Sequence, residues 1–178
     1  FLNFHRTYYH PSNSYIYLYG NMDMEEKLAF LDEHYLSHFD YLDVDSVIQE
    51  QKAFGACQDV TLEYPVAENE GEEDNTYLSY NMVVGNAADS QMAMAFEVLD
   101  YALLSAPGAP LKQALLDVKA GKDVYGSYDD GILQPYFTVI AKGSNPDRKE
   151  EFVSVIRQVL GDIVKNGIDK KAVEAGIN

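Results

Sequence analysis

The sequence predicts an α+β fold in which helices cover one face of a largely antiparallel sheet. The apolar residues of successive segments recur with the two-residue period of strands or the 3.6-residue period of helices. These patterns give the order helix tail, strand, helix, two strands, two helices, two strands, helix and the start of a last helix. With 178 residues, 47% of them apolar, the chain is long enough to bury a core.

The first twenty residues predict a helix tail followed by a strand. The opening FLNFHRTYYHP is typical of a helix that Pro11 ends, because a proline disfavours the α conformation of the residue before it. The aromatic and β-branched run SYIYLYG predicts a strand over residues 14–19, with its tyrosines on one face and Ile16 and Leu18 on the other. Because both faces are apolar, we expect an inner strand.

The next segment predicts an amphipathic helix that begins after Asp23. Asp23 and Glu26 have the spacing of a capping box, in which each side chain satisfies a backbone N–H of the first turn. An apolar stripe follows at helical spacing: Leu28, Leu31, Tyr35 and Phe39.

Two histidines in this predicted helix raise the question of a zinc site. His34 and His38 stand four residues apart, and two imidazoles on one helix face could bind one ion. A zincin helix needs Glu directly after its first His, where this chain has Tyr35. The inverted HxxEH arrangement needs Glu directly before its second His, where this chain has Ser37. No general base is supplied here, so we expect no zinc site.

The middle of the chain predicts two strands and a long helix. The strands are expected in CQDVTLEYPV and in TYLSYNMVVG, with the acidic segment ENEGEED as a solvated loop between them. Asp89 is the expected cap of a helix whose apolar residues include methionines that fill the core.

The last third predicts helices around a pair of strands. Pro110 suits the first position of a short helix, and KDVYGSYDDGILQPYFTVIAKG predicts two strands around a turn. A long amphipathic helix is expected to follow, with Asn145 as its cap and Gly167 at its end. Asp169 is the expected cap of the last helix.

Composition limits the partners and the compartment. The net charge of −16 argues against binding to nucleic acid or to an anionic membrane, since both interactions need basic residues. No run of roughly 20 apolar residues and no signal peptide is present, so a cytoplasmic location and no membrane association are expected. Cys57 is the only cysteine, and we expect it to be a buried apolar residue.

Two stretches resemble the pitrilysin or insulinase family of zinc metallopeptidases, and are most similar to its presequence-protease branch. The first is FHRTYYHPSNSYIYLYGNMDMEEKLAFLDEHYLSHF, in which HPSN precedes a predicted strand that ends in G-N-x-D. The second is PGAPLKQALLDVKAGKDVYGSYDDGILQPYFTVIAKG, similar to a helix and hairpin of the family's second domain. The resemblance implies a fold of the mitochondrial-processing-peptidase type, with 1–50 as the end of the zinc-binding domain and 51–178 as most of a second, inactive domain, incomplete at its C-terminal end.

The resemblance also implies which residues are absent. Family members bind zinc through an HxxEH helix, and none of the four histidines of this chain has Glu in the required place. We therefore expect no metal ligand, no catalytic residue and no cofactor in this chain, with zinc held elsewhere in a parent protein.

One position is implied as a substrate contact. In its last domain the family carries an Arg followed some seven residues later by a Tyr, and both contact the substrate. Tyr125 stands at the aromatic position here, but Asp117 takes the place of the Arg, and a carboxylate cannot donate hydrogen bonds to an oxyanion. Tyr125 is accordingly either a substrate contact or a structural residue.

These expectations define a main hypothesis and two alternatives. The main hypothesis is a non-catalytic, chamber-wall section of a zinc endopeptidase that degrades peptides, partnered by the remainder of its own polypeptide and by peptides, including basic ones. An excised piece is expected to self-associate or to have frayed ends. One alternative is a stand-alone peptide-binding or structural module of the same fold. The other, an independent hydrolase, has only Asp129 and Asp130 in its favour, and adjacent strand residues point to opposite faces.

Overall fold

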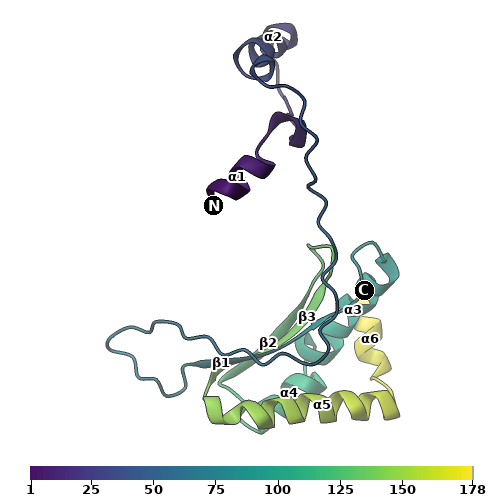
Figure 1. Ribbon diagram of the computed structural model, residues 1–178. Coiled ribbons are helices and arrows are strands. Elements are labelled where there is room, and N and C mark those ends of the chain that lie inside the picture. Colours follow the sequence, from purple (N-terminus) through teal and green to yellow (C-terminus); the bar gives the residue numbers. More distant parts are fainter. Residues whose placement is uncertain (178) are drawn as a thin grey trace. The chain divides into compact units, whose positions relative to one another are not determined.

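The computed structural model describes residues 1–177 and separates into two compact units, Phe1–Gln49 and Glu50–Asn178 (Figure 1). Each unit has its own helices, and the strands all belong to the second. The assignment of 1–50 and 51–178 to two peptidase domains stays a prediction.

The first unit consists of two helices and two short 3₁₀ turns. Helix α1 spans Leu2–Tyr8 and α2 spans Met24–His34, with 3₁₀ turns at Pro11–Asn13 and Leu36–His38. The predicted cap of α2 is confirmed for Asp23, whose Oδ1 accepts a hydrogen bond from the Glu26 N–H at 3.0 Å. The Glu26 side chain accepts from Lys27 Nζ at 2.8 Å instead of completing a capping box.

Two predictions for this unit are wrong. Residues 14–19 form no strand, because no segment of the unit pairs with them, and their tyrosines are exposed rather than covered. Helix α2 ends at His34, because Tyr35 leaves the helical conformation with φ −139° and ψ −64°. His38 therefore lies in the following 3₁₀ turn and does not share a helix with His34.

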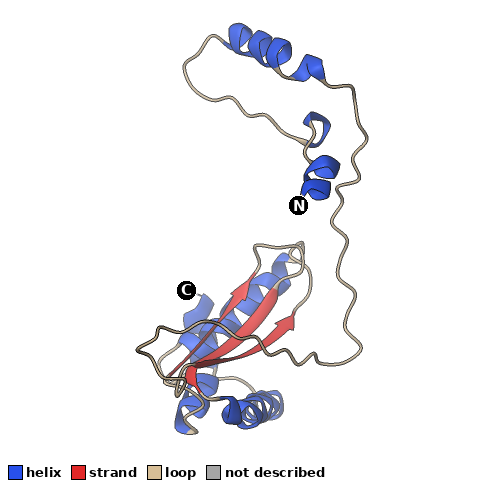
Figure 2. Ribbon diagram, turned by 60° about the vertical axis from the view of Figure 1, so that its left-hand side comes forward, coloured by secondary structure: helices blue, strands red, loops and turns tan. Residues whose placement is uncertain are grey.

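The second unit confirms the predicted α+β fold. Three strands form an antiparallel sheet in the order β1-β3-β2, with β1 at Thr76–Val83, β2 at Asp123–Asp129 and β3 at Tyr136–Ser144. The helices are α3 (Ser90–Asp100, continued by π-helical Tyr101–Ser105), α4 (Pro110–Asp117), α5 (Lys149–Asn166, preceded by a 3₁₀ turn at Pro146–Arg148) and α6 (Lys170–Ile177). They lie on one side of the sheet (Figure 2).

The core lies between the sheet and these helices. Alternation along the strands puts Val124 of β2 beside Ala141 of β3, and both side chains are fully buried. From the helix side, α4 contributes Leu111 and Leu115, and α5 contributes Phe152 and Ile156. Burial of such side chains is the main favourable contribution to folding.

Most of the local signals for helix ends in this unit are confirmed. Asp89 Oδ1 accepts from the Met92 N–H at 3.0 Å, and Pro110 is the first residue of α4. Gly167 ends α5 with φ +87°, and Asp169 Oδ1 accepts from the Lys171 N–H at 2.9 Å. Asn145 is the exception to the predicted role, because its side chain bonds Asp74 instead of the helix N-terminus.

A long connection over residues 39–75 contains neither helix nor strand. The strand predicted in CQDVTLEYPV is therefore absent, and its apolar residues Val60 and Leu62 are exposed. Cys57 is also exposed, so the expectation of a buried cysteine is wrong. The methionines predicted to fill the core are partly misplaced too, since Met94 of α3 is 67% exposed. Composition indicates that a residue is apolar, but only packing decides whether a neighbour covers it.

Gly126 offers a direct test of the packing between β2 and the helices. A Cβ there would collide with the Thr138 carbonyl oxygen and lie 2.6 Å from Leu104 Cδ1. We expect Gly126→Ala to destabilise the protein by about 2 kcal/mol or more, in the range of overpacked cores. In α5, Gly161 has open space around its Cβ position, so Gly161→Ala should stabilise by about 0.5–1 kcal/mol. Urea unfolding measures both variants, and equal effects would contradict the packing described.

Candidate functional site

Tyr125 lies on the face of the sheet that the helices leave open. It stands in β2 opposite Ile140 of β3, next to Val124, whose buried side chain points to the helices. Side chains of adjacent strand residues point to opposite faces, so Tyr125 projects away from the core. Its ring is 40% exposed, which leaves it accessible to another molecule.

Hydrogen bonds within and between strands order the polar side chains of this open face. Thr138 Oγ1 donates to Asn81 Oδ1 at 2.6 Å, and Asn81 Nδ2 donates to Ser79 Oγ at 3.1 Å. Tyr136 OH donates to Asp129 Oδ2 at 3.0 Å, and this hydrogen bond raises the pKa of Tyr136. The result is a preorganised polar surface.

Aromatic rings and one cation complete the open face. The Nζ of Lys142 lies 5.8 Å from the centre of the Tyr77 ring, within the range of a cation–π contact. Tyr77 also meets Tyr64 of the long connection edge to face, with ring centres 5.8 Å apart. Rings and amide or hydroxyl groups of this kind can contact a peptide, but nothing among them pairs a nucleophile with a base.

Asp117, which takes the place of the family's Arg, is the last residue of α4. Its Oδ1 accepts a hydrogen bond from Gln113 Nε2 at 2.7 Å, one helical turn earlier. The carboxylate therefore accepts a hydrogen bond within α4 and cannot donate one to an oxyanion. The carboxylate of Asp129, the other one considered from the sequence, accepts hydrogen bonds from the Tyr136 OH and from the Gly131 N–H.

The histidines do not form a metal centre. The ring of His34 lies tilted against that of Phe30, with ring centres 4.5 Å apart, and His38 lies beyond the end of α2. Across residues 1–177, no group of three or more His, Cys, Asp or Glu side chains is placed to hold a metal ion.

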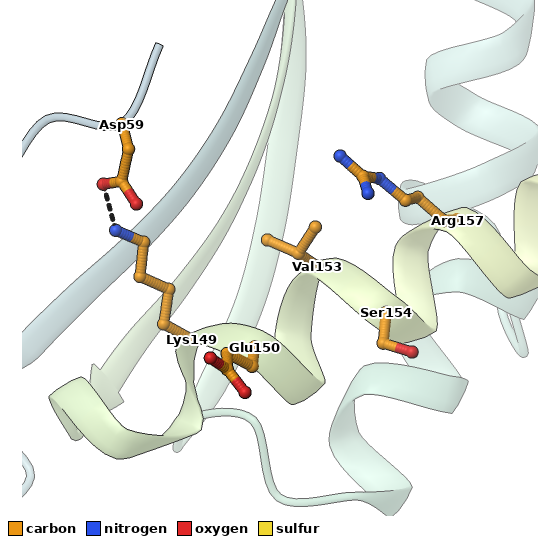
Figure 3. Close-up of a pocket in the computed structure, with 6 residues that line it drawn as sticks. All are labelled: Asp59, Lys149, Glu150, Val153, Ser154 and Arg157. Carbon is orange, nitrogen blue, oxygen red and sulfur yellow. Dashed lines mark hydrogen bonds and ion pairs between the residues drawn. The ribbon is translucent and has the colours of Figure 1, made fainter. Parts of the chain in front are cut away.

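A shallow pocket of about 460 Å³ lies on the outer side of α5 (Figure 3). It is lined by Asp59, Lys149, Glu150, Val153, Ser154 and Arg157. Lys149 Nζ donates to Asp59 Oδ1, so the ion pair joins the long connection to the first turn of α5. Both partners are well exposed, and such pairs contribute little free energy of folding. The ion pair therefore holds the long connection against α5, and the pocket shows no feature of a binding site.

Sequence reasoning missed the junction that anchors the end of the acidic loop. The Asp74 N–H donates to Asn145 Oδ1 at 2.9 Å, and Asn145 Nδ2 donates to Asp74 Oδ1 at 2.8 Å. The hydrogen bond from Asn145 is the largest influence lowering the pKa of Asp74, and Lys122, at 3.3 Å, adds to it. Asp74 has φ +57°, a conformation that Asp tolerates better than most residues. Only that tolerance could have been noticed in the sequence.

Comparison with known families identifies the chain. The family described as "Peptidase M16 inactive domain" matches residues 1–178, and the chain belongs to it. This confirms the resemblance to the zinc metallopeptidases and makes the chain a non-catalytic section of a peptidase. An inactive domain fits the lack of an HxxEH motif in these residues.

Individual relatives agree with the family. Protein HypA of Clostridium perfringens (strain 13 / Type A) is 46% identical over 178 residues, covering 100% of this chain and 18% of that protein. Presequence protease 1, chloroplastic/mitochondrial, of Arabidopsis thaliana is 32% identical over 182 residues, covering 100% and 17%. Presequence protease, mitochondrial, of Xenopus laevis is 27% identical over 177 residues, covering 97% and 17%. The chain thus spans about a sixth of the length of these relatives.

The expected cytoplasmic location is wrong. The presequence proteases similar to this chain are named as mitochondrial or chloroplastic proteins. The prediction failed because the lack of a long apolar segment does not specify a compartment. No helix among residues 1–177 is both long and apolar enough to cross a membrane.

The Asp74 junction predicts a pH dependence. The folded pKa of Asp74 is below its value of 3.8 in an unfolded chain, so its contribution to stability is present above about pH 4 and is lost as the pH falls through the folded pKa. The protection of the backbone between residues 72 and 78 against hydrogen exchange, taken relative to the intrinsic exchange rate at each pH, should therefore decrease as the pH falls below 4. Asp74→Ala should show quick exchange already at pH 6. A variant that exchanges like the unmodified chain at pH 6 would contradict the anchoring role.

The histidine geometry predicts weak zinc binding. Because His34 and His38 lack a third ligand and do not share a helix, we expect no stoichiometric zinc in purified protein and no peptide cleavage after zinc is added. Metal analysis and calorimetric titration test this, with His34→Ala as the control. Tight binding of one zinc ion that His34→Ala abolishes would overturn the expectation.

Proposed function

We propose that this chain forms part of the wall of a closed chamber in a longer zinc-dependent endopeptidase that degrades peptides. The observation that carries the proposal is the match of the whole chain to an inactive peptidase domain, together with the open, preorganised sheet face around Tyr125. An inactive domain can still position substrate, because productive geometry depends on groups remote from the reacting atoms.

The two units would belong to different domains of that peptidase. Residues 1–50 carry the HPSN and G-N-x-D motifs and would complete the zinc-binding domain, whose HxxEH helix would lie elsewhere in the polypeptide. Residues 51–178 would form most of the second domain. The division of the described chain near residue 50 supports this assignment. The main partner would then be the remainder of the same polypeptide.

Tyr125 would contact the peptide substrate. Its exposed ring on the face without helices supports this role, and an aromatic ring can pack against peptide side chains of many kinds. In the polypeptide that contains this chain, Tyr125→Ala should raise KM for peptides several-fold with little change in kcat, whereas Tyr125→Phe should retain most of the affinity. Val164→Ala, at an exposed apolar position of α5, is the matched control. Unchanged KM in Tyr125→Ala would remove Tyr125 from the substrate site.

The negative charge of the chain would favour basic peptides. With a net charge of −16, the protein attracts cations. Salt limits the range of this attraction, because the Debye length is about 10 Å at 0.1 M salt. We expect weak binding of a basic peptide that falls as salt is raised, and weaker binding of a neutral peptide of equal length. Fluorescence titration at two salt concentrations measures this. Equal affinity for the two peptides would leave the charge as a contribution to solubility alone.

The alternative is a stand-alone peptide-binding or structural module. It differs from the main proposal in one observable, since the polypeptide of a peptidase must contain HxxEH. Loss of cleavage when a chelator removes zinc from that polypeptide, with recovery on adding zinc back, would favour the peptidase. A polypeptide without the motif and without cleavage would favour the module.

A further inference from the structure

The HPSN segment of the first unit holds the beginning of the long connection. Ser12 Oγ accepts a hydrogen bond from the Leu42 N–H at 3.1 Å. Four residues further along the connection, Ser46 Oγ donates to Asn13 Oδ1 at 2.7 Å. We call Ser12 and Asn13 the first anchor, because together they fix residues 42–46 on the first unit.

Local hydrogen bonds set the position of the first anchor. Pro11–Asn13 forms a 3₁₀ turn, and the Ser12 N–H donates to His10 Nδ1 at 3.2 Å. Asn13 Nδ2 donates to the carbonyl oxygen of Tyr8 at 2.9 Å, so its Oδ1 is the atom that remains for the connection. The anchor is therefore ordered by its own neighbours in sequence before the connection binds it.

Two other side chains hold the connection where the second unit begins. Gln134 Oε1 accepts from the Gln51 N–H at 2.6 Å, and Gln134 Nε2 donates to the Gln51 carbonyl oxygen at 3.1 Å. One amide thus satisfies both backbone groups of Gln51, as a paired strand residue would. Asn86 Nδ2 donates to Glu50 Oε1 at 2.5 Å. We call Gln134 and Asn86 the second anchor.

The sheet brings the two members of the second anchor together. Asn86 follows β1 and Gln134 precedes β3, and these two strands are paired. The Val84 N–H donates to the Pro135 carbonyl oxygen at 2.8 Å, which continues this pairing beyond the strand ends. Asn86 Oδ1 accepts from the Ala88 N–H at 2.9 Å, so the amide is oriented with its Nδ2 toward the connection.

Three residues lie between the two anchors: Val47, Ile48 and Gln49. Within the described chain these three residues form no hydrogen bond, and Val47 and Ile48 are 71% and 83% exposed. The division into two compact units falls directly after Gln49. Few contacts and no hydrogen bonds give a segment low local stability, and hinges consist of a few such loop residues.

We propose that Val47–Gln49 is a hinge between the two units and that the two anchors delimit it. Residues 42–46 then stay on the first unit and residues 50–51 on the second, so a change in the orientation of the units alters the backbone angles of Val47–Gln49. This assigns the HPSN motif a positioning role toward the connection. The inference rests on hydrogen bonds formed within each unit and not on the proposed function.

Backbone amide relaxation of the whole chain, measured by NMR, tests the proposal. We expect order parameters near the rigid value of about 0.85 for residues 42–46 and 50–51, and values below about 0.6 for Val47–Gln49. A gradual decrease across residues 42–51, without a step after Ser46 and before Glu50, would overturn the proposal.

Two variants test whether the anchors set the limits of the hinge. Ser46→Ala removes a hydrogen bond of the first anchor without altering HPSN, so the order parameters of residues 43–46 should fall below about 0.6 while those of 50–51 stay unchanged. Gln134→Ala should have the reverse effect. Gln91→Ala, at an exposed position of α3, is the matched control and should change neither range. Loss of order on both sides in either variant, or on neither side, would contradict the anchoring roles.

Discussion

The central position of β3 is the constraint on which the second unit depends. This strand pairs with β1 on one edge and β2 on the other, so its register sets the place of every other side chain in the sheet. Val139 and Ala141 are almost completely buried against the helices. Phe152 and Ile156 of α5 close the same core, and the loss of either would leave a cavity that the strands could not fill.

The same register divides the sheet into a buried face and an open one. Because strand residues alternate, burial of Val124 determines that Tyr125 points outward, toward the hydrogen-bonded row that includes Asn81 and Thr138. The open face is thus a consequence of core packing and not a separate feature. Its order, with Thr138 buried and bonded to Asn81, distinguishes it from an ordinary solvated surface.

Exposed apolar residues show which parts of the chain lack neighbours. The first unit has no fully buried residue, although its sequence is rich in aromatic side chains. Its exposed apolar side chains therefore have no neighbour among the described residues that covers them fully. Asp100 stands where α3 meets the π-helical turn. Its Oδ1 is buried, and no hydrogen-bond partner for this oxygen is present among the described residues.

Local signals and whole-chain motifs were readable from the sequence alone, because they depend on neighbours within a few residues. The caps at Asp23 and Asp89, Pro110 at the start of α4, and the hairpin of β2 and β3 were predicted from such patterns, as were the α+β class and the family. Residues 14–19 and 57–66 have equally clear strand patterns, yet neither forms a strand, because a strand requires hydrogen bonds from a partner that local sequence does not specify. Only the tertiary structure decided that Asn145 bonds Asp74 and that Tyr125 faces away from the core, since each depends on residues distant in the chain.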